Sequence, residues 1–269
     1  NNGVLALNRS DATSFDGAIS GSGAVRIIGG DVTLMAANSY TGGTVVDGGT
    51  LRAGVDGAFV DLTAYIVNGG TLDLNGFGLG MSSLSGTGGT VAIGASALTV
   101  QQDIDTNFGG SLSGTGLFSK GGKGTLTLSD DNSAFTGEGF VGDGTLAVNG
   151  VFGGSLDIAP AGRLQGTGTV GDTIVSGTIA PGNSIGTLNI AGNITFNPGS
   201  IYEVEVNAAG QGDKIVATGM ATIGGGTVRV LVGMGNYATA KTYTILTANG
   251  IDGVHGAFEG VTSNLAFLD

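Results

Sequence analysis

The chain has 269 residues, of which 56 are glycine, 3 are proline and none is cysteine or tryptophan. The glycines follow no Gly-X-Y period, which excludes collagen, and a 41% share of hydrophobic residues excludes a disordered chain. Only 11% of the residues are charged, the net charge is −12, and the nine basic residues are scattered singly. This pattern argues against nucleic acid and anionic lipid as partners.

The chain begins within its repeating pattern at Asn1, without a methionine or a signal peptide, so we expect a segment of a longer protein. A short unit then recurs, in which glycine is followed by Thr or Ser and by an apolar-x-apolar pair. It occurs at Gly49–Leu51, Gly70–Leu74, Gly89–Ile93, Gly124–Leu128, Gly144–Val148, Gly154–Ile158 and Gly186–Ile190. Alternation with period two is typical of a half-buried strand. Thr50, Thr71 and Thr90 open three such units about 20 residues apart, which indicates one solenoid coil per interval.

The alternation also predicts which side chains point inward. We expect an inward stack of Leu72, Leu74, Val91, Ile93, Leu126, Leu128, Leu146, Val148, Leu156, Ile158, Leu188 and Ile190. The outward positions are expected to be Asp73, Thr127, Ala147, Asp157 and Asn189. No stretch places apolar residues at helical spacing, and a solenoid needs no crossover helices because each coil is its own crossover. The predicted fold is therefore an all-β, parallel β-solenoid.

A longer phrase recurs at an offset of 95 positions without a gap. Tyr40–Leu51 aligns with Phe135–Leu146, and both copies are preceded by a Gly-x-Gly triplet and a leucine, at Gly21–Gly23 with Leu34 and at Gly114–Gly116 with Leu128. Such self-similarity predicts stacked units that bury their apolar faces against their neighbours. We place the two copies near residues 21–54 and 114–150.

The pattern changes after about Ala159, where longer and less interrupted strands are predicted. These are Ser200–Val206, Asp213–Ala217, Thr227–Val232 and Lys241–Leu246. Longer strands joined by glycine-containing turns indicate hairpins or widened coils. A solenoid also needs a cap, because its last coil would otherwise expose unpaired backbone groups and apolar side chains. We therefore expect β-helix coils over residues 1–159 and a C-terminal cap over residues 160–269.

The repeated phrases resemble the autotransporter-associated β-strand repeat. The likeness is carried by Leu126–Leu128, Asn132, Phe135–Gly137 and Gly144–Leu146, and in the earlier copy by Leu34, Asn38, Tyr40–Gly42 and Gly49–Leu51. Further on, Pro181–Leu188 looks like the start of the C-terminal region of autotransporter passenger domains. That region, often called the autochaperone, is also matched by Tyr202-Glu203, Gly212–Ile215, Gly225–Val228, Tyr243–Leu246, Gly253, Gly256–Phe258 and Asn264-Leu265.

The resemblance implies a right-handed β-helix that is the passenger of a type V autotransporter in a Gram-negative bacterium. It implies secretion or display at the cell surface, with the protein's own C-terminal outer-membrane β-barrel as partner. The chain stops at Leu268-Asp269, so we expect the passenger alone. Two further partner classes stay open, a host-cell or matrix ligand and self-association between rods.

Residues that could carry chemistry are few. His255 is the only histidine and lies in a glycine-rich segment, where a surface or capping-loop role is expected. One histidine without cysteine does not supply the ligands of a zinc site. Asp103 and Asp105 alternate beside Gln101, so they are expected on one outer strand face, as a solvated pair or as the acids of a glycoside hydrolase. Asp130-Asp131 is expected in a turn.

Aromatic residues offer one more candidate site. Tyr40 and Phe135 occupy matching positions of the two copies, where they could form a carbohydrate-stacking stripe or, as we expect, pack at a coil corner. Two functions of different classes remain. The favoured one is a structural and adhesive surface protein without catalytic, cofactor or metal residues. The alternative is a β-helical polysaccharide lyase or hydrolase, for which the basic residues are too dispersed to stabilise a carbanion.

Overall fold

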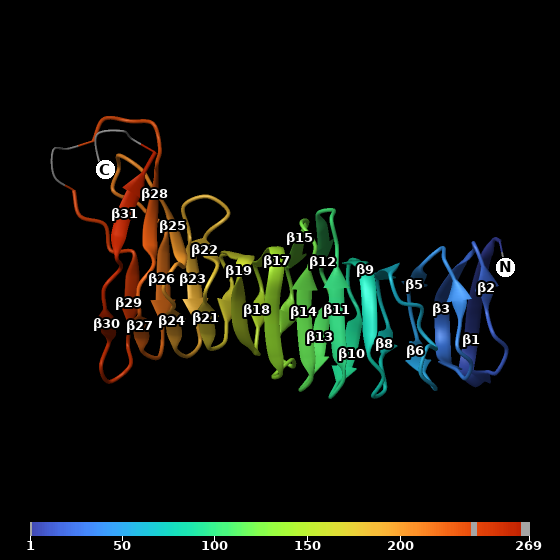
Figure 1. Cartoon of the computed structure of the whole chain (residues 1–269). Coiled ribbons are helices and arrows are strands. Elements are labelled where there is room, and N and C mark those ends of the chain that lie inside the picture. Colours follow the sequence, from blue (N-terminus) through green and yellow to red (C-terminus); the bar gives the residue numbers. More distant parts are fainter. Residues whose placement is uncertain (1, 238–240, 265–269) are drawn as a thin grey trace. The chain divides into compact units, whose positions relative to one another are not determined.

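The computed structural model describes residues 2–237 and 241–264, and the regular elements within these ranges are all β-strands (Figure 1). The chain divides into two compact units, residues 1–139 and 140–269, and each unit is described by itself. The predicted division near residue 160 rests on the change of strand pattern and stays a prediction. Leu265, one of the residues that carry the resemblance, lies outside the described residues.

Short strands joined by glycine-containing turns make up the first unit. They are β1 (Val4–Phe15), β2 (Ser20–Gly21), β3 (Ala24–Leu34), β4 (Ser39–Tyr40), β5 (Thr44–Val46), β6 (Thr50–Ala53), β7 (Thr63–Val67), β8 (Thr71–Asp73), β9 (Leu79–Ser85), β10 (Thr90–Gly94), β11 (Ala97–Gln101), β12 (Thr106–Phe108), β13 (Ser111–Gly114), β14 (Leu117–Gly121), β15 (Thr125–Leu128) and β16 (Asp131–Asn132).

Strands of successive coils in the first unit pair in parallel. Leu51 of β6 pairs with Leu72 of β8, which pairs with Val91 of β10. Val91 in turn pairs with Leu112 of β13. Each partner follows about 20 residues after the last, the interval at which the glycine-threonine units recur. The spacing therefore confirms the prediction of a parallel β-solenoid.

The buried columns lie where the alternation predicts them. All twelve residues of the expected inward stack are buried, with at most 2% of their surface exposed. Of the expected outward residues, Asp157 is exposed and Asp73, Thr127 and Asn189 are half-buried. Ala147 was expected to meet solvent and is buried instead. Its methyl group projects little from the sheet, so an outward direction does not bring it to the surface.

The strands of the second unit are longer toward its C-terminal end. They are β17 (Glu138–Val148, which starts in the first unit), β18 (Val151–Phe152), β19 (Ser155–Gly166), β20 (Thr169–Val170), β21 (Thr173–Val175), β22 (Thr178–Pro181), β23 (Thr187–Ile190), β24 (Ile194–Phe196), β25 (Ile201–Val206), β26 (Lys214–Ala217), β27 (Ala221–Ile223), β28 (Thr227–Val232), β29 (Leu246–Ala248), β30 (Val254–Gly256) and β31 (Gly260–Ser263).

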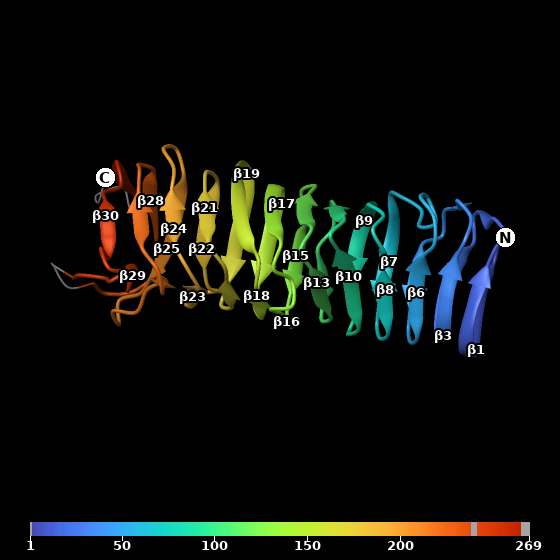
Figure 2. The same cartoon turned by 90° about the horizontal axis from the view of Figure 1, so that it is seen from below.

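Three parallel ladders run through the second unit, and Figure 2 shows β19, β21, β24, β28 and β30 following one another in chain order. One ladder joins β19, β21, β24, β27 and β30. A second joins β19, β22, β25, β28 and β31. The third joins β18, β20, β23, β26 and β29. The long strand β19 starts two of the ladders, and each later coil contributes one strand to each ladder.

The coils of the second unit widen along the chain, which is one of the two outcomes predicted for its longer strands. Thr169 pairs with Asn189, whereas Leu188 pairs with Ile215 and Ile215 with Leu246. The coil thus grows from about 20 to about 30 residues while the pairing stays parallel. The extra residues lie in the segments between the strands.

One predicted strand is wrong. The segment Lys241–Leu246 was expected to be extended, yet residues 241–245 belong to no strand and β29 begins at Leu246. Hydrogen bonds from its side chains, and not ladder bonds between strands, hold this segment. The Tyr243 hydroxyl donates to the Asn207 carbonyl oxygen at 2.7 Å, and Lys241 Nζ donates to the Ala208 carbonyl oxygen at 3.0 Å. Strand propensity alone predicted the segment, and these side-chain bonds prevailed.

The last described coil is the most exposed part of the second unit. Val261 of β31 continues the inward column of Val228, but 60% of its surface is exposed against 5% for Val228. Beside it, Phe258 packs on Phe196 and Tyr202, with ring centroids 5.0 and 6.0 Å apart. This aromatic cluster covers part of the interior at the end of the described chain.

Candidate functional site

The loop that starts at the last residue of β22 is held by hydrogen bonds to other segments of the second unit. It contains Pro181–Gly186, the segment in which the resemblance to a passenger C-terminal region begins. Gly182 has a φ of +92° and donates its N–H to the Gly166 carbonyl oxygen at 2.8 Å. A β-carbon at Gly182 would overlap the Ser184 carbonyl oxygen. Only glycine fits both the angle and the space, so the turn fixes the path of the loop.

A single carboxylate holds the other end of this loop. Asp213 precedes β26 and exposes 2% of its surface. Its Oδ1 accepts the N–H of Gly186 at 2.8 Å, and its Oδ2 accepts the N–H of Glu205 at 2.8 Å. The Asp213 N–H donates to the Glu205 carbonyl oxygen at 2.8 Å. Asp213 therefore connects the loop, β25 and β26.

The surroundings of Asp213 favour its neutral form. Burial raises the pKa of Asp213 to about 6, although the two amide donors favour the charged form. The nearby carboxylates of Glu205 and Glu203 add repulsion that raises the pKa further. A carboxyl group that is half ionised near pH 6 is therefore built into the contact between loop and ladder.

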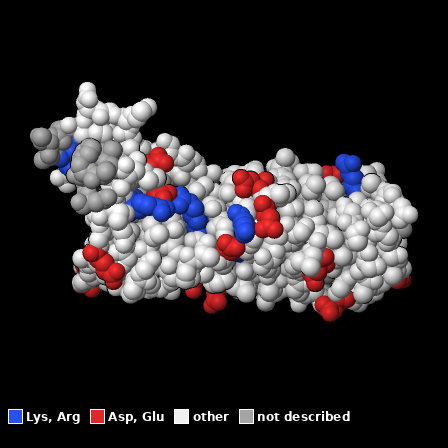
Figure 3. All heavy atoms as spheres, turned by 45° about the horizontal axis from the view of Figure 1, so that its top comes forward, with Lys and Arg blue, Asp and Glu red and all other residues white. Residues whose placement is uncertain are grey.

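Glu203 of β25 lies between two arginines, on the outward side of the ladder that joins β19, β22, β25 and β28. Arg163 Nη2 is 2.6 Å from Glu203 Oε1, and Arg229 pairs with Glu203 Oε2. Burial by itself would raise the pKa of Glu203, but the bonds to Arg163 and Arg229 hold it below its ordinary value. The three side chains join β19, β25 and β28. Elsewhere on the face in Figure 3, charged side chains form only small separate groups.

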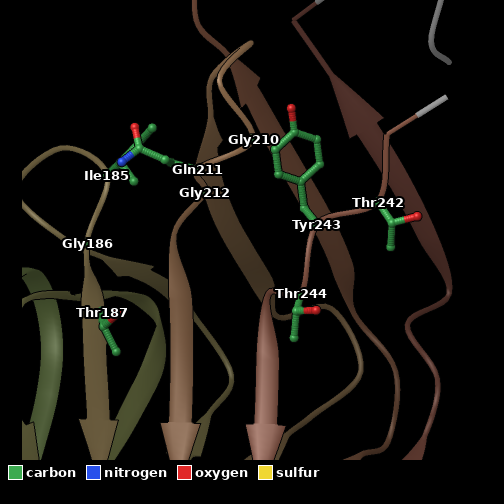
Figure 4. A pocket seen from close by; sticks show the side chains of 9 residues that line it. All are labelled: Ile185, Gly186, Thr187, Gly210, Gln211, Gly212, Thr242, Tyr243 and Thr244. Carbon is green, nitrogen blue, oxygen red and sulfur yellow. The ribbon is translucent and has the colours of Figure 1, made fainter. Parts of the chain in front are cut away.

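The loop separates two hollows. The smaller one has a volume of about 150 Å³ and is lined by charged and polar residues, including Arg163, Ser184 and Asp213. The larger one has a volume of about 510 Å³ and is lined by uncharged residues (Figure 4). Its walls are Ile185, Gly186, Thr187, Gly210, Gln211, Gly212, Thr242, Tyr243 and Thr244. Neither hollow could be predicted from the sequence, because their walls come from segments of different coils.

The acidic pair proposed from the sequence is placed differently from the prediction. β11 ends at Gln101, so Asp103 and Asp105 lie in the bend after it and not on a strand face. Asp103 Oδ1 accepts the N–H of Lys123 at 2.9 Å, and Asp105 Oδ1 accepts the N–H of Thr125 at 2.7 Å. Both carboxylates thus bond the backbone of the next coil.

A buried glutamine in the same bend was missed by the sequence reasoning. Gln102 is fully buried, and its Nε2 donates to the carbonyl oxygens of Ile104 and Thr125 at 3.1 and 2.9 Å. Its Oε1 accepts the N–H of Leu84 at 3.3 Å. Its position continues the inward alternation of Leu98 and Val100, but a polar side chain gave no reason to expect burial there.

His255 and Asp131 both lie in short strands. His255 lies in β30, is exposed and pairs with Thr222, so it belongs to a strand and not to a loop. Asp131 begins β16, and its Oδ1 accepts the N–H of Ser133 at 2.8 Å, as expected for an aspartate at a turn. Within residues 2–237 and 241–264, no group of three or more acidic or histidine side chains has the arrangement of a metal site.

The matching aromatic positions are packing positions. Tyr40 and Phe135 are both fully buried, which excludes a carbohydrate-stacking surface there. The Tyr40 hydroxyl lies 2.7 Å from Thr44 Oγ1, so its polar end is satisfied inside the coil.

The asparagines of the two copies have equivalent roles. Asn38 Oδ1 accepts the N–H of Ile19, and Asn132 Oδ1 accepts the N–H of Leu112, both at 2.7 Å. In each case the partner lies in the preceding coil. Asn38 Nδ2 also donates to the Ala58 carbonyl oxygen of the following coil at 2.6 Å. The repeated Asn therefore bonds neighbouring coils at a corner, and its recurrence was the sequence signal for it.

Comparison with known families gives one match. The passenger-associated-transport-repeat matches residues 29–53 and 118–148, which fall within the two copies identified in the sequence. None of the described residues forms a helix that is long and apolar enough to cross a membrane.

Curated relatives agree with this match. The chain is 40% identical over 155 residues, or 54% of its length, to the adhesin BmaC autotransporter of Brucella suis. It is 38% identical over 168 residues, or 58% of its length, to an extracellular serine protease of Serratia marcescens. A second extracellular serine protease of that organism is 31% identical over 169 residues. The matches span 4% of the adhesin and 16% of each protease.

Proposed function

We propose that this autotransporter passenger segment, which carries two passenger-associated-transport-repeats, is a non-catalytic stalk that serves adhesion at the cell surface. The observation that carries the proposal is the repeated coil itself. Fully buried apolar columns and parallel ladders build a scaffold in which each coil stacks on the preceding one. Similarity to an autotransporter named as an adhesin supports the same role. The outer-membrane partner implied by the resemblance belongs to this proposal.

The proposal that the chain is not an enzyme rests on how its acids are used. Asp103, Asp105 and Asp213 accept backbone N–H groups of neighbouring segments, and Glu203 is paired with two arginines. Such carboxylates hold the coils together. Incubation of the purified chain with acidic and neutral polysaccharides should release no new reducing ends and no unsaturated products. Turnover that is lost in the Asp103→Asn variant would refute a purely structural role.

We propose further that residues 160–269 promote folding and secretion of the passenger, as an autochaperone. A parallel solenoid has non-local pairing and folds slowly without a template. In this part of the chain, side-chain bonds add to the ladders and connect several coils. Asp213 bonds the loop and β25, and the Tyr202 hydroxyl donates to the Ile245 carbonyl oxygen at 2.5 Å. A coil stabilised in this way offers a formed edge on which the preceding coil can pair.

Two fragments test the folding role. Residues 160–269 alone should unfold cooperatively and show slow hydrogen exchange, whereas residues 1–159 alone should refold poorly or aggregate. Addition of the first fragment should raise the refolding yield of the second. Equal refolding of the two fragments would contradict the proposal.

A further inference from the structure

The larger hollow beside the Pro181–Gly186 loop is lined by neutral polar groups. Thr187, Gln211, Thr242, Tyr243 and Thr244 are among the residues that line it (Figure 4). Among the described residues that line it none is charged, and Lys241 lies beside the lining residue Gly210. A volume of about 510 Å³ is within the usual range for small-molecule pockets.

Hydrogen bonds hold the Tyr243 side of the hollow. The Tyr243 hydroxyl donates to the Asn207 carbonyl oxygen at 2.7 Å, which fixes the ring. Asn207 in turn donates from Nδ2 to Gln211 Oε1 at 2.8 Å and accepts the Gln211 N–H at Oδ1. A β-carbon at Gly212 would lie 3.4 Å from Tyr243 Cδ1, so glycine leaves the ring uncovered. This wall is formed before any ligand binds.

The opposite wall is held by Asp213. Its carboxylate accepts the N–H of Gly186, and Ile185, Gly186 and Thr187 form the side of the hollow that faces Tyr243. The two walls therefore have fixed positions, and a ligand would lose little free energy in ordering them.

We propose that this hollow binds a neutral saccharide unit. An aromatic ring offers a face for the C–H groups of a sugar, and hydroxyl and amide groups can donate to and accept from its hydroxyls. Tyr243 is the stacking residue, and Thr187, Thr244 and Gln211 supply the hydrogen bonds. The described side chains that line the hollow offer no charge to an ionic ligand. The site uses only the lining residues and does not depend on the proposed folding role.

The test is titration of the full chain with maltotriose, cellotriose and chitotriose, followed by calorimetry and saturation-transfer NMR, with sialyllactose as the anionic probe. At least one neutral trisaccharide should bind with a dissociation constant of about 1 mM or lower, and more tightly than sialyllactose. Tyr243→Ala should weaken that binding at least about fivefold, and Thr187→Val should weaken it less.

Tyr237→Ala is the matched control. Tyr237 bonds the Val206 and Gly233 carbonyl oxygens and does not line the hollow, so its removal should leave the affinity unchanged. Thermal unfolding verifies that each variant is folded. If Tyr243→Ala does not fold, the affinity of Thr187→Val tests the site. Absence of binding to all three neutral trisaccharides at about 10 mM, tighter binding of sialyllactose, or equal binding by the Tyr243 and Tyr237 variants would overturn the proposal.

Discussion

The coils between Leu51 and Leu112 and the coils between Ile201 and Ser263 share one fold but are stabilised differently. In the first region, short strands repeat about every 20 residues, and ladders and buried apolar columns connect them. Exposed aspartates such as Asp103 and Asp105 also bond the backbone of the next coil there. In the second region the coils are wider, and buried or paired charged groups such as Asp213 and Glu203 add bonds between coils. Wider coils have longer segments between their strands. In these segments, side-chain hydrogen bonds connect the coils because there are no ladder bonds.

The largest expected effect concerns the apolar columns of the first unit. Leu126→Asp places an unpaired carboxylate in a fully buried column and should lower the free energy of unfolding by more than about 3 kcal/mol. Urea unfolding followed by circular dichroism measures it. Thr127→Asp is the matched control, because Thr127 is half-buried on the outward side of the same strand. Similar losses in the two variants would contradict the assignment of inner and outer faces.

A smaller effect is expected at the corner of the repeat. Asn38→Ala leaves the Ile19 N–H and the Ala58 carbonyl oxygen without their partner and should lower the free energy of unfolding by about 2 kcal/mol. Asn68→Ala is the control, because Asn68 bonds Asp47 at the surface and should change stability by less than about 0.5 kcal/mol. If the two variants unfold at the same urea concentration, the corner bonds do not contribute as described.

The second region should respond to pH through Asp213. Its pKa is raised to about 6 in the folded chain, above the ordinary value, so the folded state binds more protons than the unfolded state between about pH 4 and 6. Its contribution is therefore most favourable at low pH and decreases as the pH rises through 6. Acidification from about pH 7 to 5 should raise the melting temperature.

Asp213→Asn provides the comparison for the pH dependence. Asn does not titrate and keeps one acceptor, so the variant should show a constant offset and a flatter pH profile between about pH 5 and 7. The lowered pKa of Glu203 makes its contribution decrease only at lower pH, outside this window. A wild-type melting temperature that decreases from pH 7 to 5, or equal profiles for the two proteins, would contradict the buried position of this carboxyl group.

Much of the first region could be predicted from the sequence, because period-two alternation determines which side of a strand is buried. Leu72, Leu74 and Val91 lie in the columns for this reason. The bond between Asp213 and Gly186 could not be predicted. It joins residues 27 positions apart in coils of changing width, where no repeat indicates the register. The strand predicted over Lys241–Leu246 was wrong for residues 241–245, where side-chain bonds prevailed over strand propensity.

The asparagines of the two repeats were predictable as recurring residues, but their bonds were not. Recurrence of Asn38 and Asn132 shows that the position matters, while the partner in the preceding coil follows only from the stacking. The two hollows could not be predicted from the sequence for the same reason. Residues such as Thr187, Gln211 and Tyr243 come together only when coils of different width are stacked.

Pulse-labelled hydrogen exchange during refolding of the full chain tests most directly the claim that the C-terminal region templates the solenoid. Amides of β25, β26 and β28 should become protected first. Those of β10, β8 and β6 should follow in this order, because β10 is nearest along the chain to the C-terminal region. Earlier or simultaneous protection of β6, β8 and β10 would contradict the claim.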